Sequence, residues 1–167
     1  MKRHLSILLA IFIGASTALA EDLERPKGDV VLTISGDIAQ TNVDDTLQFD
    51  HTMLQDLDTT VVETSTIWTD GVRRFQGVSL KVLTELLEVE EGTLRATAIN
   101  DYSVEIPVTD AIEDGPIIAY LMDGRKMSVR EKGPLWVIYP YDKTSKYRSE
   151  VIYSRSIWQL DRIQVVE

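Results

Sequence analysis

The amino-acid sequence predicts a β-rich α+β fold in a single domain, with two or three short helices. Many short runs of β-branched and apolar residues are separated by glycine, asparagine and aspartate, which favour turns. Two stretches instead place apolar residues at helical spacing behind an N-capping residue. Of the 167 residues, 147 follow an N-terminal segment of 20, and that length suits one hydrophobic core.

The first half of the chain is expected to combine strands with one helical turn. Asp50 is a good N-cap for that turn. One face of the turn would carry Met53, Leu54 and Leu57. Asp70-Gly71 would end the third strand. The strands predicted in this half are residues 30–35, 46–49 and 59–68.

The second half is expected to begin with a helix and continue in strands. Ser79 is a good N-cap for a helix over residues 80–88, whose leucines repeat at helical spacing. Asn100-Asp101 suits a hairpin turn between two strands, and Pro107 would end the second of them. The strands predicted in this half are residues 94–99, 102–106, 117–122, 135–139 and 157–166.

The N-terminus has the features of a signal peptide, residues 1–20. Lys2-Arg3-His4 is basic, a short apolar run follows, and Ala18-Leu19-Ala20 offers small residues for cleavage after Ala20. The apolar run is shorter than the roughly 20 residues that span a bilayer, which leaves an uncleaved anchor as the weaker alternative. Cleavage removes two basic residues and leaves 15 against 27 acidic ones, a net charge of −12. Such a charge disfavours nucleic-acid binding.

The composition restricts the chemistry that residues 21–167 can perform. The chain contains no cysteine, so it can provide neither a thiolate ligand nor a thiolate nucleophile. It contains two histidines, and His4 leaves with the signal peptide. A histidine-rich metal site is thereby excluded, and a Ser-His-Asp triad would depend on His51 alone. The favoured interpretation of His51 is a helix start beside its cap, Asp50.

Five segments together resemble the sulfite-oxidase-type molybdopterin-binding fold. The first is similar to the family's aromatic-x-Gly-Val-x-Leu element before a leucine-rich helix, and the second to its Asp-x-Tyr strand. The third is similar to the family's turn that contains alanine and then glycine. The fourth is similar to its strand that begins with Gly-Pro, and the fifth to its closing strand that contains tryptophan. The segments are FQGVSL (75–80), NDYSVEIP (100–107), AYLMDGRKM (119–127), GPLWVIYP (133–140) and residues 158–165. The resemblance implies a molybdopterin-binding-like domain over residues 21–167.

The chain departs from that family at the metal ligand. Enzymes of this fold hold molybdenum through a cysteine thiolate, and the matching window here is Ser65-Thr66-Ile67-Trp68. The expectation is therefore a protein that is not an enzyme and binds no molybdenum. Basic residues that could hold the cofactor's phosphate occur at Arg73-Arg74, Arg125-Lys126 and around Arg130, where solvated loops explain them equally well.

The resemblance implies an inherited pocket for a pterin, a flat bicycle with many hydrogen-bonding groups. The candidate ligand-binding residues are Trp68, Asn100, Asp101, Tyr102, Arg130, Arg155 and Trp158. The aromatic residues would stack on the ring, Asn100 and Asp101 would bind its edge, and the arginines would reach oxygens. Each group has a structural alternative: a hairpin turn for Asn100-Asp101, a buried core for Trp158, and a solvated loop for Arg130.

Two further segments are WTDGVR (68–73) and SRSIWQL (154–160). With them and without cysteine, the chain also resembles an offshoot of the family, periplasmic pterin-binding proteins that regulate cyclic-di-GMP enzymes. This resemblance implies that the protein binds a reduced pterin in the periplasm. It would dock on the periplasmic domain of an inner-membrane GGDEF/EAL-type synthase or phosphodiesterase and relay pterin occupancy. One alternative is a molybdopterin-dependent oxidoreductase with a non-cysteine metal site, for example at Ser65. Another is an interaction protein whose pocket stays empty.

Overall fold

The computed structural model describes residues 23–166, and the expected signal peptide at residues 1–20 lies outside that range. Within it, ten strands form one sheet, with short helices between them. The strands are β1 (Val30–Gly36), β2 (Leu47–Asp50), β3 (Thr59–Ser65), β4 (Val72–Ser79), β5 (Thr93–Ala98), β6 (Ser103–Pro107), β7 (Ile117–Met122), β8 (Arg125–Lys126), β9 (Leu135–Ile138) and β10 (Trp158–Val166). The α-helices are α1 (His51–Asp56), α2 (Leu80–Leu86) and α3 (Glu150–Arg155), and the 3-10 helices are η1 (Val108–Asp110), η2 (Val129–Glu131) and η3 (Ser145–Tyr147).

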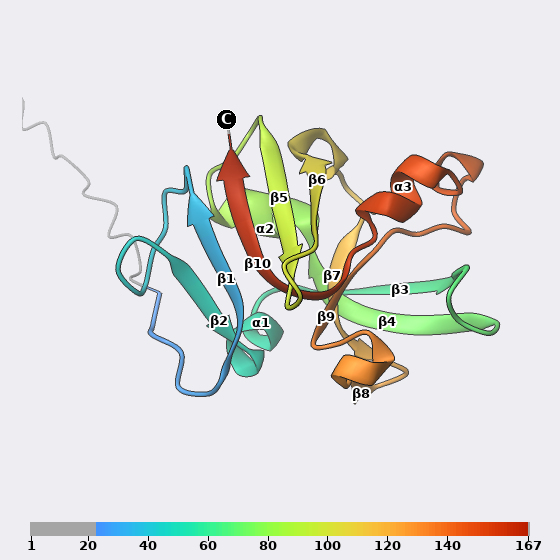
Figure 1. Ribbon diagram of the computed structural model, residues 1–167, viewed down its shortest axis with the longest axis horizontal. Helices are drawn as coiled ribbons and strands as arrows, with labels where there is room; N and C mark the ends of the chain where they lie inside the picture. The colour runs from blue at the N-terminus through green and yellow to red at the C-terminus, as the bar shows by residue number, and fades with distance from the viewer. Residues whose placement is uncertain (1–22, 167) are drawn as a thin grey trace, which may run out of the picture.

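The long strand β10 organises the sheet because it pairs with three other strands. Its first residues are antiparallel to β9, and its later residues lie between parallel β1 and antiparallel β5. The main path of the sheet runs β2-β1-β10-β9-β7-β4-β3, with β5 and β6 branching from β10. In Figure 1, β1, β10, β5 and β6 stand side by side, whereas β3 and β4 extend away from them as a long hairpin. The start of β10 therefore lies where these two parts of the sheet meet.

The predicted helix starts at Asp50 and Ser79 are confirmed. The side chain of Asp50 accepts a hydrogen bond from the N–H of Met53 at 2.9 Å, and that of Ser79 accepts one from the N–H of Val82 at 3.0 Å. Each bond satisfies a backbone donor that the first helical turn leaves without a partner. Both helices lie beside β4, and in Figure 1 α2 lies behind the upright strands.

Strand β4 lies between β3 and β7. Its polar residues make it hard to recognise as a strand from the sequence. Arg73, Arg74 and Gln76 interrupt the apolar pattern, and only Phe75, Val78 and Gly77 are buried. Gly77 is required by packing, because a Cβ atom at this position would collide with the backbone carbonyl of Ile118 in β7. The glycine of the FQGVSL segment thus permits the close approach of two strands.

The hydrophobic core is one cluster of buried side chains from the sheet and from α2. Its fully buried members come from strands on both sides of β10, for example Ile34 in β1, Phe75 in β4 and Trp136 in β9. Leu80 and Leu83 of α2 pack into the same core, as the helical spacing predicts. Among residues 23–166, no helix is both long enough and apolar enough to cross a membrane.

Candidate functional site

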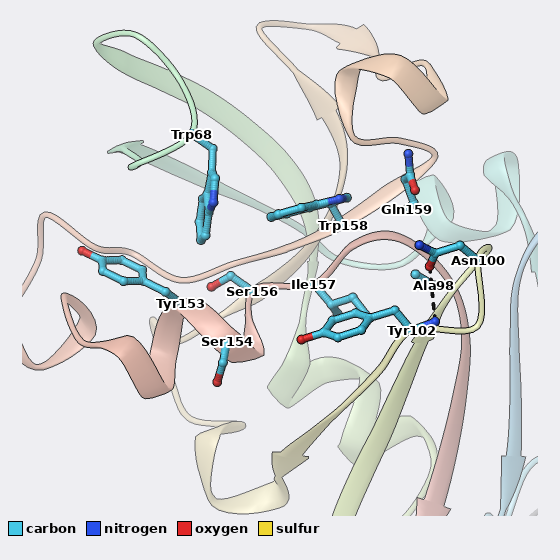
Figure 2. A pocket seen from close by; sticks show the side chains of 10 residues that line it. All are labelled: Trp68, Ala98, Asn100, Tyr102, Tyr153, Ser154, Ser156, Ile157, Trp158 and Gln159. Carbon is cyan, nitrogen blue, oxygen red and sulfur yellow. Dashed lines mark hydrogen bonds between the residues drawn. The ribbon is translucent and has the colours of Figure 1, made fainter.

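A pocket of about 310 Å³ lies beside the start of β10, at the lower end of the roughly 300–1,000 Å³ typical of small-molecule sites. Four separate parts of the chain form its walls: the β3–β4 loop, the β5–β6 turn, the end of α3 and the start of β10. Figure 2 shows these side chains around the cavity. The lining residues are Trp68, Ala98, Asn100, Tyr102, Tyr153, Ser154, Ser156, Ile157, Trp158 and Gln159.

Trp68 is held by the loop between β3 and β4. The hydroxyl of Thr66 accepts a hydrogen bond from the N–H of Trp68 at 3.1 Å, which folds the loop back after β3 ends. The indole then meets four aromatic rings edge-on, those of Trp136, Tyr141, Tyr153 and Trp158, at centroid distances of 5.6–6.2 Å. Edge-on contacts of this kind fix the position of the ring.

Trp158 and Gln159 both face the pocket because the strand is irregular there. Successive residues of a regular strand point to opposite faces. At Gln159 the backbone has a φ of 54°, and the register with β9 shifts between Trp158 and Leu160. A bulge of this kind re-aims side chains. Trp158 is 37% exposed, while its neighbour Trp136 is fully buried.

The β5–β6 turn carries Asn100 and Tyr102 and confirms the predicted hairpin. The Oδ1 atom of Asn100 accepts a hydrogen bond from the N–H of Tyr102 at 3.2 Å, drawn as a dashed line in Figure 2. The N–H of Asp101 donates to the carbonyl of Ala98 at 2.9 Å. These bonds leave the amide nitrogen of Asn100 facing the pocket side of the turn (Figure 2).

Buried hydrogen bonds fix the wall that follows α3. The hydroxyl of Tyr141 donates to that of Ser156 at 2.6 Å, and the Ser156 hydroxyl donates to the carbonyl of Ile152 at 2.8 Å. Burial raises the pKa of Tyr141 to about 12, so the phenol stays protonated as the donor. The Nε1 atom of Trp136 donates to the carbonyl of Ser156 at 3.2 Å. The wall is therefore preformed.

Four of the seven candidate residues lie together in this pocket: Trp68, Asn100, Tyr102 and Trp158. The other three lie elsewhere. The carboxylate of Asp101 is 84% exposed and pairs with Arg162 at 2.8 Å, outside the pocket lining. Arg155 pairs with Asp110 at 2.9 Å, and Arg130 lies exposed on η2.

Several lining residues are not among the candidates named from the sequence, chiefly Tyr153, Ser154, Ser156 and Gln159. The first three belong to α3 and the turn after it, and no helix was predicted there. Ser149 was an available signal, since its side chain accepts a hydrogen bond from the N–H of Ile152 at 3.4 Å and caps α3. Gln159 depends on the bulge in β10, for which the sequence offers no signal.

The pocket combines aromatic walls with neutral polar groups. None of its ten lining residues carries a charge. The amide nitrogen of Gln159 donates to the carbonyl of Val129 at 2.8 Å, which directs its Oε1 atom away from that carbonyl. Asn100 and Gln159 thus present an amide donor and an amide acceptor at the same end of the cavity (Figure 2).

The window that would hold molybdenum does not fit that metal. Ser65 donates its N–H and its hydroxyl to the carboxylate of Asp142, at 2.6 Å and 2.7 Å. These two bonds also hold the pKa of Asp142 below its usual range. The chain has no thiolate to offer in place of the engaged hydroxyl. The uncharged lining likewise offers no cation for the phosphate of molybdopterin.

Comparison with known proteins identifies the fold. No family model matches the chain, and no curated protein matches it. Among solved structures, the chain is similar to the sulfane dehydrogenase SoxCD from Paracoccus pantotrophus, with 18% sequence identity and a TM-score of 0.57. The match covers 80% of this chain and 37% of that chain, so this protein spans little more than a third of its neighbour. The predicted β-rich, sulfite-oxidase-type fold is confirmed, and an identity this low shows the fold alone.

Proposed function

We propose that this protein binds a reduced pterin and does not transform it. The proposal depends chiefly on one observation, a preformed pocket with aromatic walls, an amide donor and acceptor at one end, and an uncharged lining. A pterin is flat and carries hydrogen-bonding groups along one edge, so this combination suits it. The sulfite-oxidase-type fold gives support, because the sequence resemblance links that fold to a pterin site.

The lining residues divide into two roles in this proposal. The faces of the bicyclic pterin ring are contacted by Trp158, Tyr102 and Trp68. The Asn100 amide donates to the ring carbonyl, and the Gln159 Oε1 atom accepts from the ring amino group. Asp101 takes no part, because Arg162 holds its carboxylate outside the pocket.

We further propose that the protein works in the periplasm and relays pterin occupancy to an inner-membrane cyclic-di-GMP synthase or phosphodiesterase. The N-terminal signal features and the family resemblance support this proposal. Exposed apolar side chains on the segments that line the pocket support a docking face: Ile67 precedes Trp68, Ile99 precedes Asn100, and Val151 lies on α3. Pterin must favour one docked state for any signal to result.

A titration of the mature protein with a tetrahydropterin, followed by tryptophan fluorescence and calorimetry, tests the binding function. We expect saturable binding at one site, with quenching because two indoles line the pocket. No binding at high micromolar concentration would contradict the proposal. That result would favour an interaction protein with an empty pocket.

A matched pair of variants tests which residue binds the edge of the ring. Asn100→Asp keeps an oxygen for the N–H of Tyr102 but loses the amide donor, so we expect the affinity to fall about three- to tenfold. Asp101→Asn removes the neighbouring carboxylate, and we expect almost no change in affinity. The opposite result would assign the ring edge to Asp101.

Metal analysis after periplasmic expression separates this proposal from the oxidoreductase alternative. We expect no stoichiometric molybdenum, because Ser65 is engaged by Asp142 and the chain contains no cysteine. Molybdenum at one equivalent, with redox activity that Ser65→Ala abolishes, would instead establish a non-cysteine metal site.

A further inference from the structure

We infer that Lys132 tunes the pocket in favour of reduced over oxidised pterin, acting through the indole ring of Trp158. The inference rests on the proposed function and adds a residue that determines specificity. The Nζ atom of Lys132 lies 4.4 Å from the centroid of the Trp158 ring and 5.6 Å from that of Trp136. Both distances are within the roughly 6 Å at which a cation is attracted to an aromatic face.

We place Lys132 and the pocket on opposite faces of Trp158 because Lys132 lies over the ring without lining the pocket. Trp158 lines the pocket, whereas Lys132 does not, although its Nζ atom is so close to the ring. Figure 2 shows Tyr102 and Ile157 on one side of the nearly edge-on indole and Gln159 on the other, and the N–H of Gln159 donates to the carbonyl of Lys132. A ligand stacked on the pocket side would therefore share the ring with the ammonium group behind it.

The loop that carries Lys132 is built to hold it in this position. Ser128 and Glu131 form a capping box around η2, and Lys132 follows it in the left-handed conformation with a φ of 74°. The N–H of Gln159 donates to the carbonyl of Lys132 at 2.9 Å, which ties the loop to the residue after Trp158. Within residues 23–166, no carboxylate forms a salt bridge with Lys132, so its charge acts on the rings.

The charge of Lys132 changes what the pocket face of Trp158 prefers to stack on. A cation over one face draws the π electrons towards itself and leaves the other face poorer in electrons. An electron-poor face stacks better on an electron-rich ring. A tetrahydropterin carries electron-donating ring nitrogens, whereas a fully oxidised pterin is an electron-poor aromatic bicycle. Lys132 thus favours the reduced ligand.

The experiment compares affinities for a tetrahydropterin and the fully oxidised pterin with the same 6-substituent, measured anaerobically by calorimetry. Lys132→Met keeps the aliphatic length but removes the charge, and Lys132→Arg keeps the charge. We expect Lys132→Met to shift the ratio of the two dissociation constants towards the oxidised form by about two- to fivefold. We expect Lys132→Arg to retain the ratio of the unmodified protein, because it keeps the positive charge. A purely structural role of Lys132 would not separate the reduced from the oxidised pterin.

A double-mutant cycle tests whether the effect passes through the indole. In a Trp158→Leu background, Lys132→Met should no longer shift the ratio. An unchanged ratio in Lys132→Met, or an equal shift in Lys132→Arg, would overturn the inference while leaving pterin binding intact. Failure of the unmodified protein to bind either form would overturn the proposed function, and this inference with it.

Discussion

Trp136 and Trp158 pair across the β9–β10 ladder, yet their surroundings give them different roles. Trp136 is fully buried, meets Phe75 edge-on at 5.5 Å and donates its Nε1 hydrogen to the backbone. Trp158 keeps 37% of its surface, lines the pocket and has the Nζ atom of Lys132 at 4.4 Å from the centroid of its ring. Trp136 therefore belongs to the core and Trp158 to the pocket.

Substitution of each tryptophan by alanine should separate these roles. We expect Trp158→Ala to weaken pterin binding about tenfold or more, with a modest loss of stability, because stacked bases lose roughly 1–3 kcal/mol when an aromatic side chain is removed. We expect Trp136→Ala to lower the free energy of unfolding by about 3–5 kcal/mol. Titration and urea denaturation measure the two effects. Equal loss of stability in both variants would place Trp158 in the core.

His51 at the start of α1 is a second residue whose role depends on its surroundings. Its Nδ1 atom is buried and, within the described residues, takes part in no hydrogen bond. Its ring meets Tyr120 edge-on at 6.1 Å. Burial, with the charge of Lys126 nearby, lowers the pKa of His51 from its ordinary value of 6.5. The folded protein therefore favours the neutral form of this imidazole.

Stability should consequently fall on mild acidification. The unfolded chain binds a proton at His51 more readily than the folded one. The stability that the neutral His51 contributes is therefore present above pH 6.5 and is lost as the pH falls below it. We expect the urea midpoint to decrease between pH 7.5 and pH 5 in the unmodified protein, and to decrease less in His51→Gln. The measurement is denaturation followed by tryptophan fluorescence. Identical pH dependence in the two proteins would remove His51 as the cause.

At the scale of elements, helix α3 is held in place by a residue distant in the sequence. Arg155 at its end pairs with Asp110 of η1 at 2.9 Å, and the two side chains are only 24% and 18% exposed. The hydroxyl of Tyr139 donates to the same carboxylate at 2.6 Å. Burial and the neighbouring Asp110 raise the pKa of Tyr139 well above its usual range, so it remains a donor. Arg155 thus positions the wall that contains Tyr153 and Ser156.

Removing the guanidinium should loosen that wall. We expect Arg155→Met to lower the free energy of unfolding by about 2 kcal/mol, because it leaves the Asp110 carboxylate partly buried without its cation. We expect a several-fold loss of pterin affinity to accompany it. Calorimetry and thermal denaturation measure both quantities.

Lys143→Met is the matched control for this prediction. Lys143 pairs with Asp114 at the same distance of 2.9 Å, but the two side chains are 50% and 74% exposed. Exposed pairs of this kind contribute little, so we expect a change within about 0.5 kcal/mol and unchanged affinity. A direct contact between Arg155 and the ligand would instead show as lost affinity without lost stability.

At the scale of the whole molecule, the pocket joins four segments that lie far apart in the sequence. Trp68, Asn100, Tyr153 and Trp158 come from different elements that meet where β10 links the two parts of the sheet. A ligand that contacts all of them binds the folded chain and not the unfolded one. Occupancy is therefore linked to global stability.

Saturation with tetrahydropterin should raise the melting temperature. At a free ligand concentration 100 times the dissociation constant, the folded state gains about 2.7 kcal/mol. For a domain of this size we expect a rise of about 5–10 °C. Differential scanning fluorimetry measures it, with Trp158→Ala as the control that should respond much less. A rise of equal size in that variant would place the ligand outside this pocket.

Much of the fold was predictable because its determinants are local. Caps such as Asp50 and Ser79, and the apolar run of β7, act within a few residues of themselves. Strand β4 was not predicted, because its arginines and glutamine break the apolar pattern of a strand. The pairing of β4 with β3 and β7 is what makes it a strand. Helix α3 buries Ile152 alone, so its sequence shows no apolar face at helical spacing.

The sequence by itself determined the lack of cysteine, the acidic charge, most of the strands and turns, and the aromatic residues available to a pocket. Tertiary structure alone decided which of them meet. It turned Asp101 and Arg155 towards Arg162 and Asp110, brought Gln159 to the pocket through a bulge, and set Lys132 behind Trp158. Composition and local pattern depend on near neighbours, whereas the direction of a side chain depends on packing and charge partners from distant parts of the chain.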